Sequence, residues 1–248
     1  MSPWPALTAP SPLSTIEKTF NQMANDHEKE VVARASLRYV QDGYIVGLGT
    51  GSTAAHAVRL LGERVHAGLT IRGIPTSSGT RTLALAAGIA LTTLDEFQQL
   101  DVTIDGTDEF DPQLNLIKGG GGALLREKII ASASKQLVII ADSSKQVATL
   151  GNFPLSVEVI PFAEALVAKK IAALGARVQR RQSADGKPYI TDERHHILDC
   201  HFGQITDPPA LARILSDMPG IVEHGLFIGM ASVVLIAKGD QVQEFRGK

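Results

Sequence analysis

The sequence predicts an α/β fold in which a parallel sheet is followed by a smaller α+β unit. Three observations predict it: short, continuously apolar strand-like runs, helical segments that alternate with them, and a change of this rhythm after Asn152. Continuous apolar runs are typical of strands buried on both faces, as in a parallel sheet covered by helices. A chain of 248 residues is long enough for one large domain with a smaller companion.

The first part alternates helices and strands from about residue 25 onward. Strand-like runs are expected at residues 44–46, 69–74, 89–94, 102–105 and 137–140. Helices are expected at residues 25–41, from just after Thr53 to about residue 65, and at residues 80–87 and 123–134. Strands that alternate with helices in this way indicate β-α-β crossovers and therefore parallel pairing.

The second part has a different order of elements. Strands are expected at residues 157–160, 177–181, 197–201 and 221–226, with helices at 163–174 and 209–215. The order βαββαβ is the split unit of a ferredoxin-like domain. A last apolar strand at residues 232–237 could return to the first sheet. We therefore predict one domain of residues 25–152 plus 228–248 and a second of residues 153–227.

Residues 1–24 differ from the rest in composition. Four prolines, Pro3, Pro5, Pro10 and Pro12, lie among Ser, Thr and Ala, with no apolar block and no arginine. A secretory signal requires the apolar block and transit peptides are usually rich in arginine, so neither interpretation fits. We interpret this segment as a flexible N-terminal extension.

Charge and cysteine content narrow the class of protein. The 24 basic and 26 acidic residues give a net charge of -2, which favours neither nucleic acid nor an anionic membrane as a partner. No apolar run approaches the roughly 20 residues that span a bilayer. The single cysteine, Cys200, excludes an intrachain disulfide and is typical of a reducing compartment, so we expect a cytoplasmic protein.

Ligands of open parallel sheets bind beyond the carboxyl ends of the strands, and four predicted strand ends carry unusual residues. The first is Gly47–Thr53, where glycines and the amides of a helix start suit an anion, and where Thr50, Ser52 and Thr53 add hydroxyl groups. Ser52 replaces the third glycine of a dinucleotide fingerprint, and the lysine of a P-loop is missing. A tight turn with Ser52 as helix cap is the alternative.

The second strand end, Asp105–Asp111, has four acids in seven residues, which suits acid–base chemistry or a metal. We expect no metal here, because the spacing is not that of a calcium loop and no histidine lies nearby. Ordinary turn chemistry with solvated acids is the alternative. Histidines 195, 196 and 201 lie on a predicted hairpin whose alternation sends neighbours to opposite faces, so no metal site is expected there either.

The third strand end places Lys118 before four glycines, Gly119–Gly122, and a helix that carries Glu127. Four consecutive glycines are costly to order, which makes sense where backbone amides wrap a ligand. The alternative is that residues 126–128 form a solvated helix face. At the fourth strand end Lys145 offers a positive charge, although a surface lysine is the alternative there.

Together the segments GLGTGSTA, DGTDEFD, LIKGGGGALLREKII and ADSSK, in this order, resemble ribose-5-phosphate isomerase of the A type. The resemblance runs from about Lys29 to the C-terminus. It implies a Rossmann-like sheet domain with a smaller ferredoxin-like lid, a homodimer or homotetramer, a small sugar phosphate as substrate, and no metal or redox cofactor. The segments DGTDEF and GGGG depart from the commoner DGADE and GGGA, and residues 75–80 do not match the family's serine-rich segment cleanly.

The resemblance also implies roles for individual residues. Glu127 is the base that moves a proton between C1 and C2, while Asp105 and Lys118 flank the enediol oxygens. The residues implied to contact the substrate are Thr50, Gly51, Ser52, Thr53, Asp105, Gly106, Thr107, Asp108, Lys118, Gly119, Gly120, Gly121 and Lys145, and Lys29 matches a lysine near the phosphate.

Two other functions are compatible with a phosphate loop and a helix glutamate. A sugar-phosphate-sensing domain of a transcription regulator would need a DNA-binding module, and the sequence before residue 25 has no basic helix pair. An acyl or CoA transferase would use Glu127 as a covalent nucleophile. Assaying ribulose 5-phosphate formation from ribose 5-phosphate separates all three functions.

Overall fold

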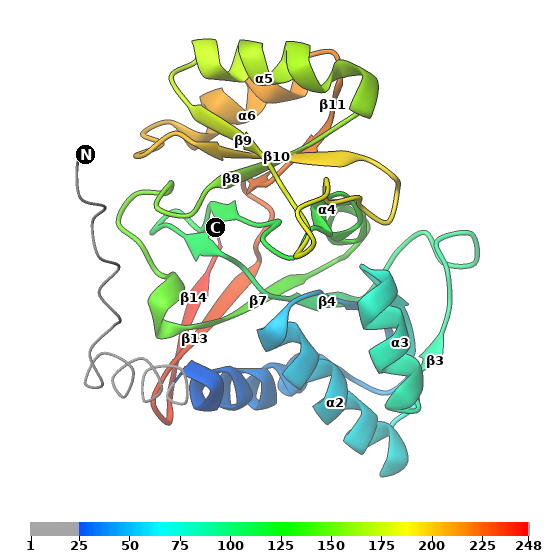
Figure 1. Ribbon diagram of the computed structural model, residues 1–248. Coiled ribbons are helices and arrows are strands. Elements are labelled where there is room, and N and C mark those ends of the chain that lie inside the picture. The colour runs from blue at the N-terminus through cyan, green and yellow to red at the C-terminus, as the bar shows by residue number, and fades with distance from the viewer. Residues whose placement is uncertain (1–24, 248) are drawn as a thin grey trace, which may run out of the picture.

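The computed structural model describes residues 25–247, so the predicted flexible extension, residues 1–24, lies outside the described residues. Figure 1 shows two units stacked on one another, a larger sheet with its helices below and a smaller sheet covered by α5 and α6 above. Residues 25–36 form a helix that continues into η1 (Leu37–Tyr39).

The larger sheet has seven strands, in the order β14-β13-β7-β4-β1-β2-β3. The strands are β1 (Ile45–Leu48), β2 (Arg72–Pro75), β3 (Ala90–Leu91), β4 (Val102–Asp105), β7 (Leu137–Asp142), β13 (Val233–Lys238) and β14 (Gln241–Arg246). All neighbours pair in parallel except β13 and β14. Counted along the chain, the parallel strands follow the Rossmann order 3-2-1-4-5-6. The predicted α/β fold and the return of residues 232–237 to the first sheet are confirmed.

Helices cover both faces of this sheet, which explains its continuous apolar strands. On one face, Val138 and Ile140 of β7 pack with the helix at residues 25–36, α2 (Ser52–His66) and α3 (Ser78–Ala86). The alternate residues, including Ile139, face the opposite core. There α4 (Leu124–Ser132) contributes apolar residues such as Ala131.

The smaller unit is a four-stranded antiparallel sheet in the order β11-β8-β10-β9. Its elements are β8 (Leu155–Val159), η3 (Pro161–Ala163), α5 (Glu164–Ala173), β9 (Arg177–Arg180), β10 (His196–His201), α6 (Pro208–Ser216) and β11 (Ile221–His224). This is the predicted βαββαβ order. Val157 and Val159 of β8 pack against Val167 and Ile171 of α5, so one face of the sheet is buried by its helices.

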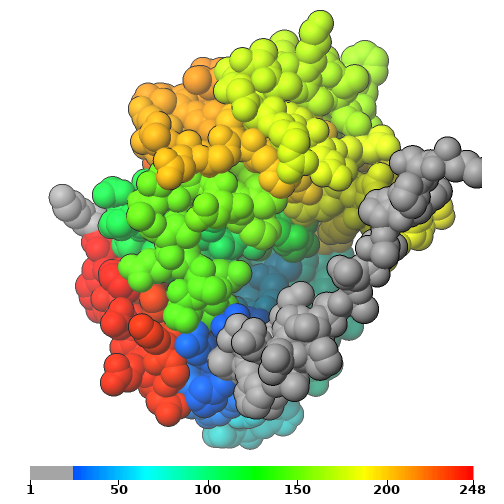
Figure 2. Space-filling view, turned by 60° about the vertical axis from the view of Figure 1, so that its left-hand side comes forward, coloured from blue at the N-terminus to red at the C-terminus, as the bar shows by residue number. Residues whose placement is uncertain are grey.

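A third, small sheet lies where the two units meet and was not predicted. It consists of β5 (Glu109–Phe110), β6 (Leu116–Ile117) and β12 (Leu226–Phe227). Each of these strands has only two residues, which is too short for an alternation of apolar and polar residues to be recognised in the sequence. The edge strand β14 was also missed, because its side chains are largely exposed and it has no apolar run. On the face seen in Figure 2, green residues from the middle of the chain lie between the orange α6 region and the red β13–β14 hairpin.

Two further observations bear on the expected function classes. No helix in residues 25–247 is long and apolar enough to cross a membrane. Within the same residues, no cluster of three or more His, Cys, Asp or Glu side chains could hold a metal ion. His195 and His196 contact different carboxylates, Glu158 at 3.0 Å and Glu164 at 2.5 Å.

Glycine at position 47 is required by the tight packing of β1 on β4. A Cβ there would lie 1.9 Å from Thr103 Oγ1 and 2.7 Å from Ile130 Cγ2. We therefore expect Gly47→Ala to lower the free energy of unfolding by about 1–3 kcal/mol, the usual cost of overpacking a core. Gly79→Ala, at an exposed position of α3, is the control, since its Cβ would meet only Ser77 Oγ at 3.8 Å. That change should be neutral or stabilise by up to about 1 kcal/mol in urea denaturation.

Candidate active site

The four unusual strand ends meet around one cavity of about 180 Å³. Loops after β1, β4, β6 and β7 supply its walls, as expected at the carboxyl edge of a parallel sheet. The lining residues are Asn25, Lys29, Thr50, Gly51, Ser52, Thr53, Gly106, Thr107, Asp108, Lys118, Gly119, Gly121, Glu127, Asp142, Ser144 and Lys145.

Three charged side chains lie at the inner end of this cavity. Lys118 Nζ is 3.0 Å from Asp105 Oδ2 and 3.5 Å from Glu127 Oε1, and it donates to Gly106 O at 2.5 Å. Their exposed fractions are 1% for Asp105, 2% for Lys118 and 4% for Glu127. One ammonium thus faces two carboxylates away from water, which is costly unless hydrogen bonds or proton uptake compensate.

The two carboxylates have different surroundings. Asp105 Oδ1 accepts hydrogen bonds from the backbone N–H groups of Thr50 at 3.1 Å and Gly106 at 2.7 Å. Glu127 Oε2 is a buried side-chain oxygen for which residues 25–247 supply no hydrogen-bond partner. Asp105 is therefore fixed by the protein, whereas one oxygen of Glu127 is left for a ligand or a proton.

The protonation states follow from this arrangement. Burial raises the pKa of Glu127 to about 8; Lys118 opposes this shift, and the carboxylates of Asp105 and Asp108 add to it. Burial also raises the pKa of Asp105, against the effect of Lys118 and of the two backbone N–H groups. Burial lowers the pKa of Lys118, but Asp105 and Glu127 outweigh it and raise the value to about 12. Lys118 thus stays cationic, and Glu127 can gain or lose a proton near neutral pH, as a general acid–base group must.

The outer end of the cavity is suited to an anion. The helix α2 begins at Ser52, so the N–H groups of its first turn lie beside the cavity together with Lys29 and Lys145. The Thr50 hydroxyl instead joins a cluster with Thr76 at 2.7 Å, Ser77 at 2.8 Å and Thr80 at 3.1 Å. Residues 76–80, which match the family pattern poorly, therefore support the loop from behind.

Glycine-rich segments allow the close approaches around the acids. A Cβ on Gly49 would lie 2.2 Å from Asp105 Oδ1, and one on Gly120 would lie 2.6 Å from Asp108 Oδ1. The Gly120 N–H donates to Asp108 Oδ2 at 2.7 Å. Both glycines let the backbone approach a carboxylate at hydrogen-bond distance.

Most of the residues singled out in the sequence meet in the cavity. Asp105 and Gly120 lie directly behind the lining, in contact with Lys118 and Asp108. The cavity also contains Asn25, Asp142 and Ser144, which had not been assigned to it. Asp142 and Ser144 belong to the ADSSK segment, whereas Asn25 begins the helix expected at residues 25–41.

Comparison with known proteins gives a consistent result. The family described as Ribose 5-phosphate isomerase A (phosphoriboisomerase A) matches residues 72–241. Ribose-5-phosphate isomerase A of Rhodopseudomonas palustris (strain HaA2) is 55% identical over 224 residues, covering 88% of this chain and 96% of the relative. The protein of the same name from Nitrobacter hamburgensis is 53% identical over 232 residues, covering 90% and 100%.

Solved structures agree with these relatives. The ribose 5-phosphate isomerase of Plasmodium falciparum superposes with a TM-score of 0.86 at 37% identity, covering 90% of this chain and 99% of that one. A D-ribose-5-phosphate isomerase in complex with phospho-erythronic acid gives a TM-score of 0.87 at 35% identity, with the same coverage. With a matching family, relatives above half identity over nearly their whole length, and this common fold, the chain belongs to the ribose-5-phosphate isomerase A family.

Proposed function

We propose that this protein interconverts D-ribose 5-phosphate and D-ribulose 5-phosphate, an aldose–ketose isomerisation of the non-oxidative pentose phosphate pathway. The observation that carries the proposal is the unpartnered oxygen of Glu127, buried at the inner end of a cavity whose outer end suits a phosphate. Membership of the isomerase family supports the choice of substrate.

Glu127 acts as the shuttling base. It removes the proton from C2 of the aldose, which gives a planar enediolate, and returns the proton to C1. One carboxylate can serve both carbons because both present the same face in the planar intermediate. A pKa of about 8 suits the role, since the group must be ionised before the first transfer and protonated before the second.

Lys118 and Asp105 flank the two oxygens of the enediolate. The negative charge that develops on the C1 oxygen faces the Lys118 ammonium, and a donor of this kind typically contributes about 10²–10³ in rate. Asp105 keeps Lys118 in place through the 3.0 Å ion pair. The remaining proton moves from the C2 hydroxyl to the C1 oxygen between these groups. C1 is reduced and C2 is oxidised within the same molecule, so the reaction needs no external oxidant or reductant.

The rest of the cavity binds the sugar and its phosphate. The phosphate lies at the start of α2, on Gly51, Ser52, Thr53 and the two lysines Lys29 and Lys145. The hydroxyl groups of the sugar contact the predicted residues Thr50, Gly106, Thr107, Asp108, Gly119 and Gly121. Gly120, which was also predicted to contact the substrate, lies directly behind this lining and holds Asp108. The solved relative with phospho-erythronic acid, a sugar acid phosphate, supports an anionic ligand of this size.

Assembly, location and domain organisation complete the proposal. A homodimer or homotetramer is supported by exposed apolar side chains on the smaller unit, including Phe162 at 99% and Leu166 at 55% exposure. A cytoplasmic location is supported by the single Cys200, whose buried thiol has its pKa raised to about 12 and is therefore unreactive. Residues 153–227 act as a lid over the domain of residues 25–152 and 228–248.

Replacing Glu127 tests the mechanism. Glu127→Gln keeps the size of the side chain but removes its basicity, so the rate of ribulose 5-phosphate formation should fall by about 10²–10⁴-fold or more. The KM should change little, because the phosphate contacts lie elsewhere. In D₂O the wild type should incorporate solvent deuterium into the product, and the variant almost none. Glu63→Gln, at an exposed position of α2, is the control and should keep wild-type turnover.

Near-normal turnover in a folded Glu127→Gln protein would remove Glu127 from the mechanism, and Asp105 would be the next carboxylate to test. Absence of isomerisation in the wild type, together with a covalent acyl group on Glu127 after incubation with an acyl-CoA, would instead favour the transferase alternative.

The raised pKa of Glu127 predicts how rate and stability depend on pH. The base must be ionised, so kcat/KM should rise with pH and level off above about 8. The folded state holds this proton more tightly than the unfolded state, whose carboxyl has the ordinary value of 4.5. The stability that the bound proton contributes to the folded state is fully present below pH 4.5 and is lost as the pH rises through about 8. Chemical denaturation of Glu127→Gln should therefore show a stability gain over the wild type that grows across this window; a constant difference would contradict the assignment.

The phosphate site can be tested at the start of α2. Ser52→Ala combined with Lys29→Met should raise the KM for ribose 5-phosphate at least about tenfold, because the protein then lacks one hydroxyl donor and one positive charge at the phosphate site. Slow turnover of unphosphorylated ribose should be unaffected. Ser78→Ala, at the equivalent first position of α3, is the control. Equal losses for both sugars would place the phosphate elsewhere.

A further inference from the structure

Arg181, which follows β9, uses every donor of its guanidinium group. Nε and Nη2 donate to the two oxygens of Asp199, at 3.0 and 2.5 Å, and Nη2 also donates to Ser156 Oγ at 2.8 Å. Nη1 donates to two backbone oxygens, Gly119 O at 2.8 Å and Gly120 O at 3.2 Å. A guanidinium has five N–H groups, so the side chain is fully engaged and held in one orientation.

These contacts join the smaller unit to the wall of the cavity. Asp199 lies on β10 and Ser156 on β8, whereas Gly119 and Gly120 belong to the loop between β6 and α4. The Arg181 side chain is 13% exposed and that of Asp199 is 20% exposed, so water competes little for these bonds. One arginine of the smaller unit therefore anchors the glycine loop on one side, while Asp108 accepts from the Gly120 N–H on the other.

The geometry of the loop transmits this contact to the ligand side. The Gly122 N–H donates to Gly119 O at 2.9 Å and closes a four-residue turn. In a trans peptide the C=O and the following N–H point in opposite directions, and residues 25–247 contain no cis bond. Gly119 O accepts a hydrogen bond from Arg181, and the N–H that follows it, that of Gly120, points away from the arginine to Asp108. Gly120 O also accepts from Arg181, so the N–H of Gly121 likewise points away from the arginine. Gly121 is a residue that lines the cavity.

We propose that Arg181 is a positioning residue for the isomerisation: by holding the carbonyl oxygens of Gly119 and Gly120, it aims the Gly121 N–H at the reacting end of the sugar and keeps Asp108 in place. The adjacent positive charge also polarises these peptides and makes their N–H groups stronger donors. This inference rests on the proposed function. It gives the smaller unit a part in the reaction besides covering the cavity.

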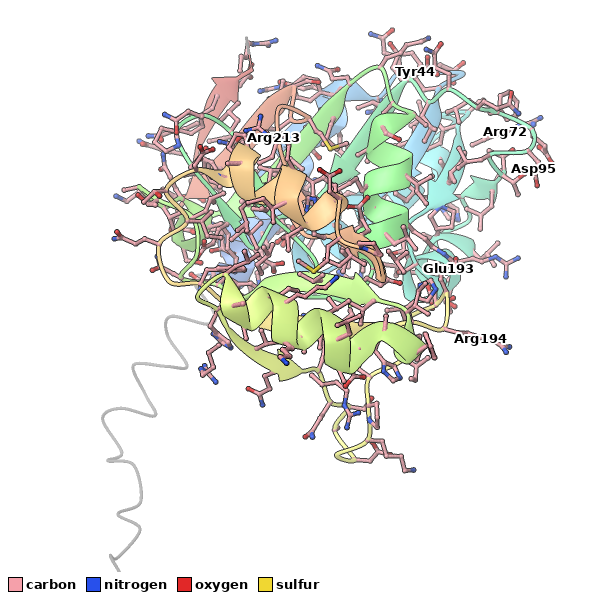
Figure 3. All side chains as sticks on the ribbon, turned by 90° about the horizontal axis from the view of Figure 1, so that it is seen from above. Tyr44, Arg72, Asp95, Glu193, Arg194 and Arg213 are labelled. Carbon is pink, nitrogen blue, oxygen red and sulfur yellow. The ribbon has the colours of Figure 1, made fainter. Side chains whose placement is uncertain are left out.

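The hairpin that follows Arg181 supports the same arrangement. The ring of Tyr189 lies 5.9 Å from the Arg181 guanidinium, and a Cβ on Gly122 would lie 2.3 Å from the Tyr189 hydroxyl. A side chain at position 122 would therefore collide with Tyr189, and glycine leaves room for the ring. At the tip, Arg126 of α4 pairs with Asp192 at 3.3 Å. Figure 3 shows Glu193 close to the larger unit, while Arg194 points away from it.

The test compares two neighbouring arginines. Arg181→Ala removes the hydrogen bonds to the glycine loop, and Arg181→Lys keeps the positive charge but loses the planar set of five N–H donors. Both variants should lower kcat about 10²-fold, the effect of a misplacement of about 1 Å at a reacting group. The KM for ribose 5-phosphate should stay within about threefold, because the start of α2 is untouched. Arg180→Ala removes the same charge from a side chain that is 42% exposed and should keep the wild-type kcat. Millimolar methylguanidinium should restore part of the rate of Arg181→Ala.

The outcomes separate this inference from the proposed function. If the wild type does not isomerise ribose 5-phosphate, the proposed function fails. If the wild type is active and a folded Arg181→Ala or Arg181→Lys protein keeps the wild-type kcat, the positioning role is overturned. Two other outcomes would assign Arg181 to folding and also overturn the positioning role. One is a lower unfolding temperature of the Arg181 variants together with an equal loss of kcat in Arg180→Ala. The other is failure of both Arg181 variants to fold.

Discussion

The buried ion triad of Asp105, Lys118 and Glu127 is the constraint on which the site depends. One ammonium cannot neutralise two carboxylates, so the triad carries an excess negative charge away from water unless a proton is bound. Asp105 is compensated by two backbone N–H groups, and the imbalance therefore falls on Glu127. The same imbalance that makes Glu127 costly to bury raises its pKa to about 8, so under the proposed function its reactivity and its cost in stability have one cause.

The fold builds this triad from elements that are distant in sequence. Asp105 ends β4, Lys118 follows β6, and Glu127 lies in the first turn of α4. The two-residue strands of the small sheet hold Lys118 in place: its N–H donates to Gly225 O at 2.8 Å, and its ammonium lies 5.5 Å from the ring of Phe227. The sheet that the sequence did not predict is thus the one that fixes the central cation.

The limits of the sequence prediction have the same physical origin. Long apolar runs predicted the parallel sheet because burial on both faces leaves a local pattern. The triplet of residues 126–128 predicts a solvated helix face as readily as an active site, and burial of Glu127 alone among them results from tertiary packing. Arg181 stands beside Arg180 in an exposed strand pattern, and nothing local distinguishes a clamp from a surface charge. The family resemblance predicted residues that meet around one cavity, but it did not predict Arg181, which contacts the glycine loop from the smaller unit.

The run of four glycines is explained by contact on both of its sides. Toward the cavity, Gly121 is one of the lining residues. Toward the smaller unit, a Cβ on Gly119 would lie 2.9 Å from Ser156 Cβ, and one on Gly120 would lie 2.9 Å from Phe153 Cζ. Any side chain there would push the two units apart and withdraw Arg181 from the carbonyl oxygens. The loop is therefore a partition between the two units: the carbonyl oxygens of Gly119 and Gly120 accept from Arg181 of the smaller unit, and the Gly120 N–H donates to Asp108.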